Sequence, residues 1–166
     1  MNAPAIAIKV REAGPLDVAA ISVLHAACFA DGLGGEAWNE SAIAQIMAMP
    51  GTYGLIVTEE AAAGAGEAPA GFALARVAGA ECEILSLGVP APWRRRGLGR
   101  VLVKAALAHG HEAGAARAFL EVAEDNSAAR ALYLAEGFSV VSRRPGHYRR
   151  GAALKDALVF ARELIP

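Results

Sequence analysis

The sequence is poor in the features that would mark a metal protein, a secreted protein or a membrane protein. Its 166 residues include only two cysteines. Cys28 and Cys82 lack metal-ligand spacing and should pack as small hydrophobic side chains in a reducing compartment. No apolar run is long and uncharged enough to cross a bilayer, and the first residues lack the apolar core and processing site of a signal peptide. We therefore expect a cytoplasmic protein that needs neither a metal ion nor a membrane.

A net charge of one sign is also missing. The 17 acidic and 16 basic residues nearly balance, so nothing in the composition favours nucleic acid or an anionic membrane as a partner. The arginines are concentrated in two short clusters, residues 94–100 and residues 143–150. Clusters of this size suit a small anionic ligand. For the second cluster, a solvated face is an equally good interpretation.

A chain of this length is expected to form one domain, residues 1–166, of the α+β class. Periodicity and turn residues predict strands at 6–10, 53–58, 71–77, 83–89, 118–123, 138–142 and 157–162. They predict helices at 15–27, 39–47 and 98–113 and from Asn126 to Gly137, with glycine-rich loops at 31–37 and 61–69. This order mixes hairpins with one strand–helix–strand crossover, which indicates a mixed sheet with helices on both faces.

The most informative segment follows the fourth predicted strand. Residues 94–100 contain three consecutive arginines and two glycines, and a helix is predicted directly behind them. Such a turn can point successive backbone N–H groups at one anion, and the helix dipole adds positive potential. Glycine also lets the backbone approach a bulky ligand without a Cβ in the way. A diphosphate is the ligand that this arrangement suits best.

Two common phosphate loops fit this segment poorly. A Walker-type loop needs Gly-Lys followed by Ser or Thr, whereas Gly99 is followed by Arg100 and Val101. A dinucleotide-binding fingerprint is closer, because Gly97 and Gly99 follow a strand and the acidic Glu121 lies about 20 residues further on. Its third glycine should fall at position 102, however, where this chain has leucine, and that motif does not require so basic a turn.

A third interpretation explains more residues. The run Arg94-Arg95-Arg96-Gly97-Leu98-Gly99 resembles the Arg/Gln-x-x-Gly-x-Gly/Ala signature that binds the pyrophosphate of acyl-CoA in the GNAT acetyltransferases. Further along, the chain resembles the RimI-type ribosomal-protein alanine N-acetyltransferases in Leu120-Glu121-Val122, Asn126, Ala129, Ala131-Leu132-Tyr133 and Gly137-Phe138. The pattern runs from about Glu83 to Asp156-Ala157, and the N-terminal half resembles the family mainly through Trp38 and Glu40. The resemblance implies a mostly antiparallel, mixed sheet of about seven strands with helices on both faces.

The resemblance also implies roles for individual residues. Glu121 would be the general base, acting directly or through water, and Tyr133 would protonate the departing thiolate. Main-chain groups of Leu87, Gly88 and Val89 would bind the pantetheine arm of acetyl-CoA as if it were an added strand, in a gap opened by splaying from the strand of Glu121, with the Val89 N–H as oxyanion donor. The implied pyrophosphate contacts are Arg94, Arg95, Arg96, Gly97, Leu98, Gly99 and Arg100, and Asn126 would both contact CoA and cap its helix. On the acceptor side, the resemblance implies Trp38, Arg144 and Tyr148, and it includes Asp156.

Each of these residues has a plainer interpretation as well. Glu121 could be a surface glutamate at a strand edge, Tyr133 an aromatic that packs its helix on the sheet, and Trp38 a core anchor. His147 stands where the family has an aromatic residue, and we expect it to be a loop histidine rather than a catalyst.

The predicted function is an acetyl-CoA-dependent N-acetyltransferase that transfers acetyl directly to a protein N-terminal amino group, as in the RimI-type enzymes, whose acceptor is the N-terminal alanine of a ribosomal protein. An α-amino group has a pKa of about 7.7–8.0 against about 10.4 for lysine, so a carboxylate deprotonates it more readily near neutral pH. Two alternatives remain open: a GNAT enzyme that acetylates a small-molecule amine, and a non-catalytic acyl-CoA-binding module. The presence of both Glu121 and Tyr133 argues against the module.

Overall fold

The computed structural model describes residues 7–30, 36–60 and 66–164. Their helices and strands follow one another in the predicted order. The elements are β1 (Ile8–Ala13), α1 (Val18–Phe29), α2 (Glu40–Met47), β2 (Thr52–Glu60), β3 (Glu67–Ala78), β4 (Glu81–Gly88), α3 (Leu98–Glu112), β5 (Arg117–Ala123), α4 (Ser127–Ala135), β6 (Ser139–Arg150) and β7 (Ala153–Glu163). Short 3₁₀ turns, Pro15–Asp17 and Ala91–Trp93, precede α1 and α3.

The differences from the sequence prediction lie at element ends. Pro15 begins a 3₁₀ turn rather than the α-helix itself, and β6 runs eight residues beyond the expected end at residue 142 (150 − 142). Ile6 and most of the two expected glycine-rich loops lie outside the described residues. The helix caps are as predicted. Asn39 Oδ1 accepts from the N–H of Ala42, and Asn126 Oδ1 accepts from the N–H of Ala129.

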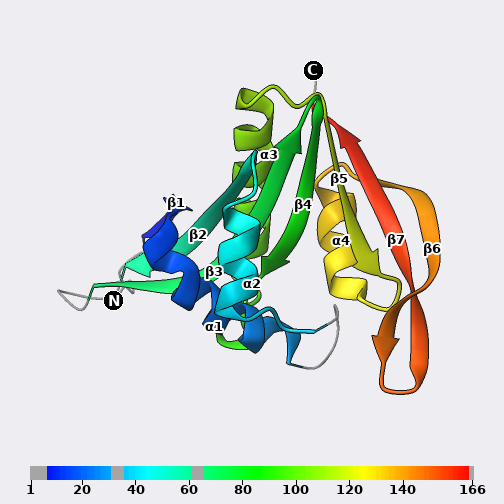
Figure 1. Cartoon of the computed structure of the whole chain (residues 1–166), viewed down its shortest axis with the longest axis horizontal. Coiled ribbons are helices and arrows are strands. Elements are labelled where there is room, and N and C mark those ends of the chain that lie inside the picture. Colours follow the sequence, from blue (N-terminus) through cyan, green and yellow to red (C-terminus); the bar gives the residue numbers. More distant parts are fainter. Residues whose placement is uncertain (1–6, 31–35, 61–65, 165–166) are drawn as a thin grey trace, which may run out of the picture.

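The described strands form one seven-stranded sheet in the order β1-β2-β3-β4-β5-β7-β6. All neighbouring strands are antiparallel except β4 and β5, which are parallel. Helices α1 and α2 lie on one face and α3 on the other (Figure 1). One hydrophobic core includes Ile21, Ile43 and Phe72, and the other includes Leu102 and Phe160. The predicted mixed, mostly antiparallel sheet with helices on both faces is confirmed.

The sheet is split between its two parallel strands. They pair only from Glu81–Arg117 to Glu83–Phe119, although β4 continues to Gly88 and β5 to Ala123. The two strands diverge from this short paired end (Figure 1). On the other side of β4, the register with β3 shifts at Leu85, which has no partner between Ile84 and Ser86. Because such a bulge bends and twists its strand, it helps to turn β4 away from β5.

Candidate active site

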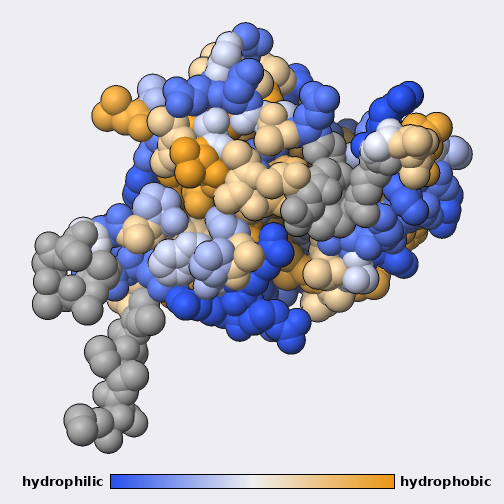
Figure 2. Space-filling view, turned by 90° about the horizontal axis from the view of Figure 1, so that it is seen from below, coloured by the Kyte–Doolittle hydropathy of each residue, from blue (hydrophilic) through white to orange (hydrophobic). Residues whose placement is uncertain are grey.

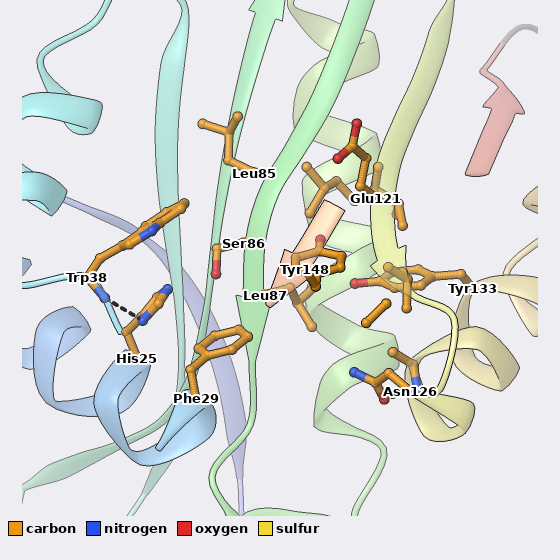
Figure 3. A pocket seen from close by; sticks show the side chains of 15 residues that line it. His25, Phe29, Trp38, Leu85, Ser86, Leu87, Glu121, Asn126, Tyr133 and Tyr148 are labelled. Carbon is orange, nitrogen blue, oxygen red and sulfur yellow. Dashed lines mark hydrogen bonds between the residues drawn. The ribbon is translucent and has the colours of Figure 1, made fainter. Parts of the chain in front are cut away.

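The gap between β4 and β5 is a cleft. Its walls come from α1, β4, β5, α4 and β6, together with Trp38 from the segment before α2. It is lined by His25, Phe29, Trp38, Ile84, Leu85, Ser86, Leu87, Leu120, Glu121, Val122, Ala123, Asn126, Ala129, Tyr133 and Tyr148. Figure 3 shows Glu121, Tyr133 and Asn126 on one side of β4, and His25, Phe29 and Trp38 on the other. Of the residues expected from the sequence, the cleft brings together Trp38, Leu87, Glu121, Asn126, Tyr133 and Tyr148.

Glu121 lies on β5 beyond the residues that pair with β4, so β5 is paired there with β7 and its edge toward β4 is open. Its side chain is 20% exposed, and its two oxygens have separate partners. Arg144 Nη1 lies 2.9 Å from Oε1, and His147 Nε2 lies 3.1 Å from Oε2. Burial and the charge of Glu121 raise the pKa of the neighbouring Glu83. Glu121 therefore lies at an open strand edge, as its plainer interpretation expects, but its side chain is partly buried and lines the cleft.

Tyr133 is both a packing residue and a polar group of the cleft. Its ring is 6% exposed and meets Phe138 edge-on at 5.7 Å between ring centroids, with Phe160 at 6.2 Å. Its hydroxyl points toward Tyr148 across the cleft (Figure 3). Burial raises the pKa of Tyr133, so the phenol keeps its proton at neutral pH. The side chain can therefore donate that proton to a group that develops negative charge.

The opposite wall is aromatic and was largely missed in the sequence. His25 is 2% exposed and stacks on Trp38 at 4.8 Å between ring centroids, and its Nδ1 accepts from the Trp38 N–H at 3.1 Å. Burial lowers the pKa of His25 to about 4, so the ring is neutral at pH 7. Phe29, one helical turn after His25, also lines the cleft. The sequence does contain one signal for this wall. His25 is the one ionisable residue among the buried residues of α1, which also include Ile21 and Leu24.

The turn after β4 has an unusual backbone. Arg95 has φ +66°, and Gly97, the N-cap of α3, has φ +78°. Left-handed backbone is costly for a residue with a Cβ, and such strain persists where the surroundings impose it. Within the described part of the chain, the N–H groups of Arg95, Arg96 and Gly97 have no hydrogen-bond partner. These three free N–H groups lie directly before the N-terminus of α3, and together they form a group of donors, here called the N–H nest, that suits an anion.

Three of the four arginines of this turn contact the protein through their side chains. Arg94 Nε donates to the carbonyl of Val89 at 2.9 Å, whereas Arg96 pairs with the buried Glu59 at 2.8 Å. Arg100 pairs with Glu136, whose side chain is 4% exposed. The side chain of Leu98 is buried in the core. The ion pairs tie the turn to β2 and to the end of α4, so its main-chain shape is braced from both sides.

Two glycines near the turn allow close packing. A Cβ on Gly88 would lie 2.7 Å from Cys28 Sγ and 2.8 Å from a ring carbon of Phe72, too close for either to remain in place. A Cβ on Gly99 would lie 3.2 Å from Leu132 Cδ2. The glycines therefore let α1 approach the end of β4, and let α3 approach α4, where the cleft meets the turn.

Two arginines of the second cluster, Arg143 and Arg144, form ion pairs, although their side chains are more than half exposed. Arg143 Nη1 lies 3.0 Å from a Glu124 oxygen and 2.8 Å from an Asp156 oxygen. The N–H of Gly146 and the Arg143 guanidinium together lower the pKa of Asp156. His147 lies in β6, not in a loop, and contacts Glu121. The expectation of a loop histidine is therefore wrong, because β6 continues past residue 142.

The described residues contain neither a membrane-spanning helix nor a metal-binding cluster. No helix in that part of the chain is long and apolar enough to cross a membrane. No group of three or more His, Cys, Asp or Glu residues within the same ranges is placed to hold a metal ion.

The fold is that of known acetyltransferases. The ribosomal-protein-S18-alanine N-acetyltransferase of Escherichia coli matches with a TM-score of 0.81 and 22% identity over 96% of each chain. NAA60 of Arabidopsis thaliana, solved in complex with a bisubstrate analogue, matches with a TM-score of 0.81 and 19% identity over 95% of this chain and 99% of that one.

Sequence similarity defines the family. The model of the acetyltransferase (GNAT) family matches residues 21–138, and the chain belongs to that family. The [ribosomal protein bS18]-alanine N-acetyltransferase of Escherichia coli K12 is 33% identical over 92 residues, which are 55% of this chain and 62% of that protein. The match thus spans about three fifths of the curated relative. The mycothiol acetyltransferase of Corynebacterium diphtheriae is 43% identical over 63 residues, 38% of this chain and 21% of that protein.

Proposed function

We propose that the chain is an acetyl-CoA-dependent N-acetyltransferase that acts on the N-terminal amino group of a protein. One observation carries the proposal. A partly buried carboxylate, Glu121, and a buried phenol, Tyr133, line the same cleft, which opens where β4 leads into a turn rich in free N–H groups. Family membership and the likeness to the bacterial ribosomal-protein enzymes support it. We also propose that residues 1–166 act as one domain.

The main chain of β4 and of the turn after it can bind the pyrophosphate and the pantetheine arm of acetyl-CoA. The free N–H groups of Arg95, Arg96 and Gly97 and the start of α3 suit the pyrophosphate. Beyond Glu83, the edge of β4 that faces β5 has no strand partner. Main-chain groups of Leu87, Gly88 and Val89 can therefore pair with the amides of the pantetheine arm. The remaining proposed contacts are Arg94, Leu98, Gly99, Arg100 and Asn126.

Two side chains would move the protons. Glu121 accepts the proton that the amine must lose, directly or through water, and Tyr133 donates a proton to the leaving sulfur. Burial raises the pKa of Tyr133, so the phenol is protonated at neutral pH and its proton is present when the sulfur leaves. The N–H of Val89 is the proposed donor to the oxyanion. Acetyl-CoA supplies the thioester whose C–S bond breaks as the new C–N bond forms.

An N-terminal amine is the favoured acceptor, with Trp38, Arg144 and Tyr148 as proposed contacts. The curated relative is named for an alanine of ribosomal protein bS18. Figure 2 shows the surface at the end toward which β4 and β5 diverge, where hydrophobic residues lie among hydrophilic ones. A small-molecule amine is the second candidate, because the mycothiol acetyltransferase shares 43% identity over 63 residues.

Acetyl transfer to a matched panel tests the acceptor. The panel holds an Ala-starting peptide, the same peptide with a blocked N-terminus and an internal lysine, and small primary amines, with products weighed by mass spectrometry. We expect a gain of one acetyl group on the free α-amine alone. Acetylation of the small amines alone would replace the first candidate by the second, and CoA binding without transfer to any amine would indicate a non-catalytic module.

The turn is tested by a pair of glycine substitutions. Gly97 and Gly79 both have positive φ, and a Cβ on either meets no atom within 4 Å. Alanine should therefore strain both by about 1 kcal/mol, while only Gly97→Ala alters the N–H nest. We expect calorimetric CoA affinity to fall about tenfold or more for Gly97→Ala and to stay at the wild-type value for Gly79→Ala. Equal affinities would place the pyrophosphate elsewhere.

A further inference from the structure

His147 lies between solvent and Glu121, the proposed general base. Its Nε2 is 3.1 Å from Glu121 Oε2, and its side chain is 40% exposed against 20% for Glu121. The other carboxylate oxygen is held by Arg144 at 2.9 Å. The imidazole is thus the group through which the less exposed carboxylate meets water on that side.

An irregularity of β6 places the ring there. Arg144 pairs with Ala157 and Tyr148 with Lys155, so three residues of β6 lie opposite one of β7. Within this bulge Gly146 has φ +60°, and its N–H donates to Asp156 Oδ1 at 2.9 Å. The ring of His147 also meets that of Tyr148 edge-on at 5.0 Å between centroids. The bulge is therefore fixed at both its backbone and its rings, and it aims His147 at Glu121.

We propose that His147 is a positioning residue and proton relay that holds Glu121 and passes the amine's proton from it to solvent. This inference rests on the proposed function.

The relay has a defined proton balance. An ammonium acceptor loses two protons on becoming an acetamide; one replaces the acetyl group on sulfur, and one is released. While Glu121 is ionised, the Nε2–H of the neutral ring donates to Oε2 and holds it. After the amine's proton reaches Glu121, exchange with water converts the exposed ring to its Nδ1–H tautomer, Nε2 accepts the proton from Oε2, and the Nδ1 proton leaves to water. A carboxylate oxygen has a second lone pair, so Oε2 can face the amine and the imidazole together. Loss of the Nδ1 proton leaves the ring as its Nε2–H tautomer, which again holds the ionised carboxylate.

The exposure of the two side chains favours this route. His147 is 40% exposed against 20% for Glu121, so a proton on the imidazole is closer to water than one on the carboxyl group. The charged or titratable groups around the pair are Glu83 from β4, Arg144 and Tyr148 from β6, Arg76 from β3 beside Glu83, and Tyr133 from α4 beside Tyr148.

Chemical rescue tests the relay. In weak buffer, we expect His147→Ala to lower kcat about tenfold with KM for both substrates within twofold, since only proton removal is slowed. Added imidazole should restore kcat in a saturable manner and leave wild type unaffected. A His147→Ala enzyme with wild-type kcat, or one that imidazole does not restore, would overturn the relay.

Two further measurements separate the relay from a structural role. His147→Gln keeps a group that can hydrogen-bond Glu121 but cannot relay a proton, so it should have the low, rescuable kcat of the alanine variant; wild-type kcat in this variant would leave only positioning. In the free wild-type chain, the ¹⁵N-NMR titration of His147 Nε2 should shift on Glu121→Gln, and an unmoved titration would contradict the contact. Wild type that transfers acetyl to no amine would instead remove the proposed function.

Discussion

The two walls of the cleft differ in how they use polar groups. The reaction wall (Glu121, Tyr133, Arg144, His147 and Tyr148) gathers charges and proton donors from β5, α4 and β6. The aromatic wall (His25, Phe29 and Trp38) has a single ionisable ring, which burial keeps neutral at pH 7. The comparison indicates a division of labour, in which one wall moves protons and the other gives the acceptor a shaped, uncharged surface.

The largest expected effect comes from removing the charge of the reaction wall. Glu121→Gln keeps the size of the side chain but cannot accept the amine's proton, so kcat/KM for a peptide acceptor should fall by about 10³. Steady-state kinetics measure this effect. Glu163→Gln is the matched control, because Glu163 also pairs with an arginine of β5, Arg117, but is 70% exposed and does not line the cleft. Equal activities of the two variants would remove Glu121 from the chemistry.

The aromatic wall should respond to acid through stability rather than through catalysis. The pKa of His25 is about 4 in the folded chain against about 6.5 when unfolded, so between these values the unfolded chain binds more protons. The free energy of unfolding should therefore be fully present above pH 6.5 and fall by about 3 kcal/mol as the pH drops to 4. Urea unfolding at several pH values measures this loss.

A pair of histidine variants isolates that contribution. His25→Gln should have a shallower dependence on pH between 6.5 and 4 than wild type, whereas His111→Gln, at an exposed position near the end of α3, should keep the wild-type slope. The same slope in all three proteins would mean that His25 is not buried as a neutral ring.

Tyr133→Phe should separate chemistry from packing within the reaction wall. The ring contacts with Phe138 and Phe160 remain and the proton donor is lost, so kcat should fall by about 10² with an unchanged melting temperature. Tyr53→Phe provides the contrast. That hydroxyl donates to the carbonyl of Ala106 at 2.7 Å away from the cleft lining, and its loss should cost about 1 kcal/mol of stability but no activity. Wild-type turnover by Tyr133→Phe would make Tyr133 a packing residue only.

The smallest effect is expected for Trp38→Phe. A phenyl ring still stacks on His25, and the backbone N–H of residue 38 still reaches Nδ1, so the fold and the proton chemistry remain. We expect KM for the peptide to rise about threefold with kcat within twofold, as for a lost uniform binding contact. A large fall in kcat would contradict the division between the walls.

The sequence predicts best what local residues decide. The order of elements, the caps by Asn39 and Asn126 and the stop at Gly137 depend on patterns within one or two turns, and all are present in the structure. The turn at residues 94–100 is likewise predicted from the sequence, because its backbone shape depends on a short local motif.

Other features depend on strands that are distant in the chain. His147 reaches Glu121 only because β6 continues and bulges against β7, and local periodicity does not encode that bulge. His25 acquires its role by stacking on Trp38, 13 residues further along (38 − 25). The contacts of Arg96 with Glu59 and of Arg100 with Glu136 likewise depend on tertiary approach.

The most direct test is a crystal structure of the chain with a non-hydrolysable acetyl-CoA analogue. We expect the pyrophosphate on the N–H groups of Arg95, Arg96 and Gly97, the pantetheine arm along the free edge of β4, and the acetyl carbonyl between Glu121 and Tyr133. A pyrophosphate bound away from this turn, or an acetyl group that reaches neither side chain, would contradict the account.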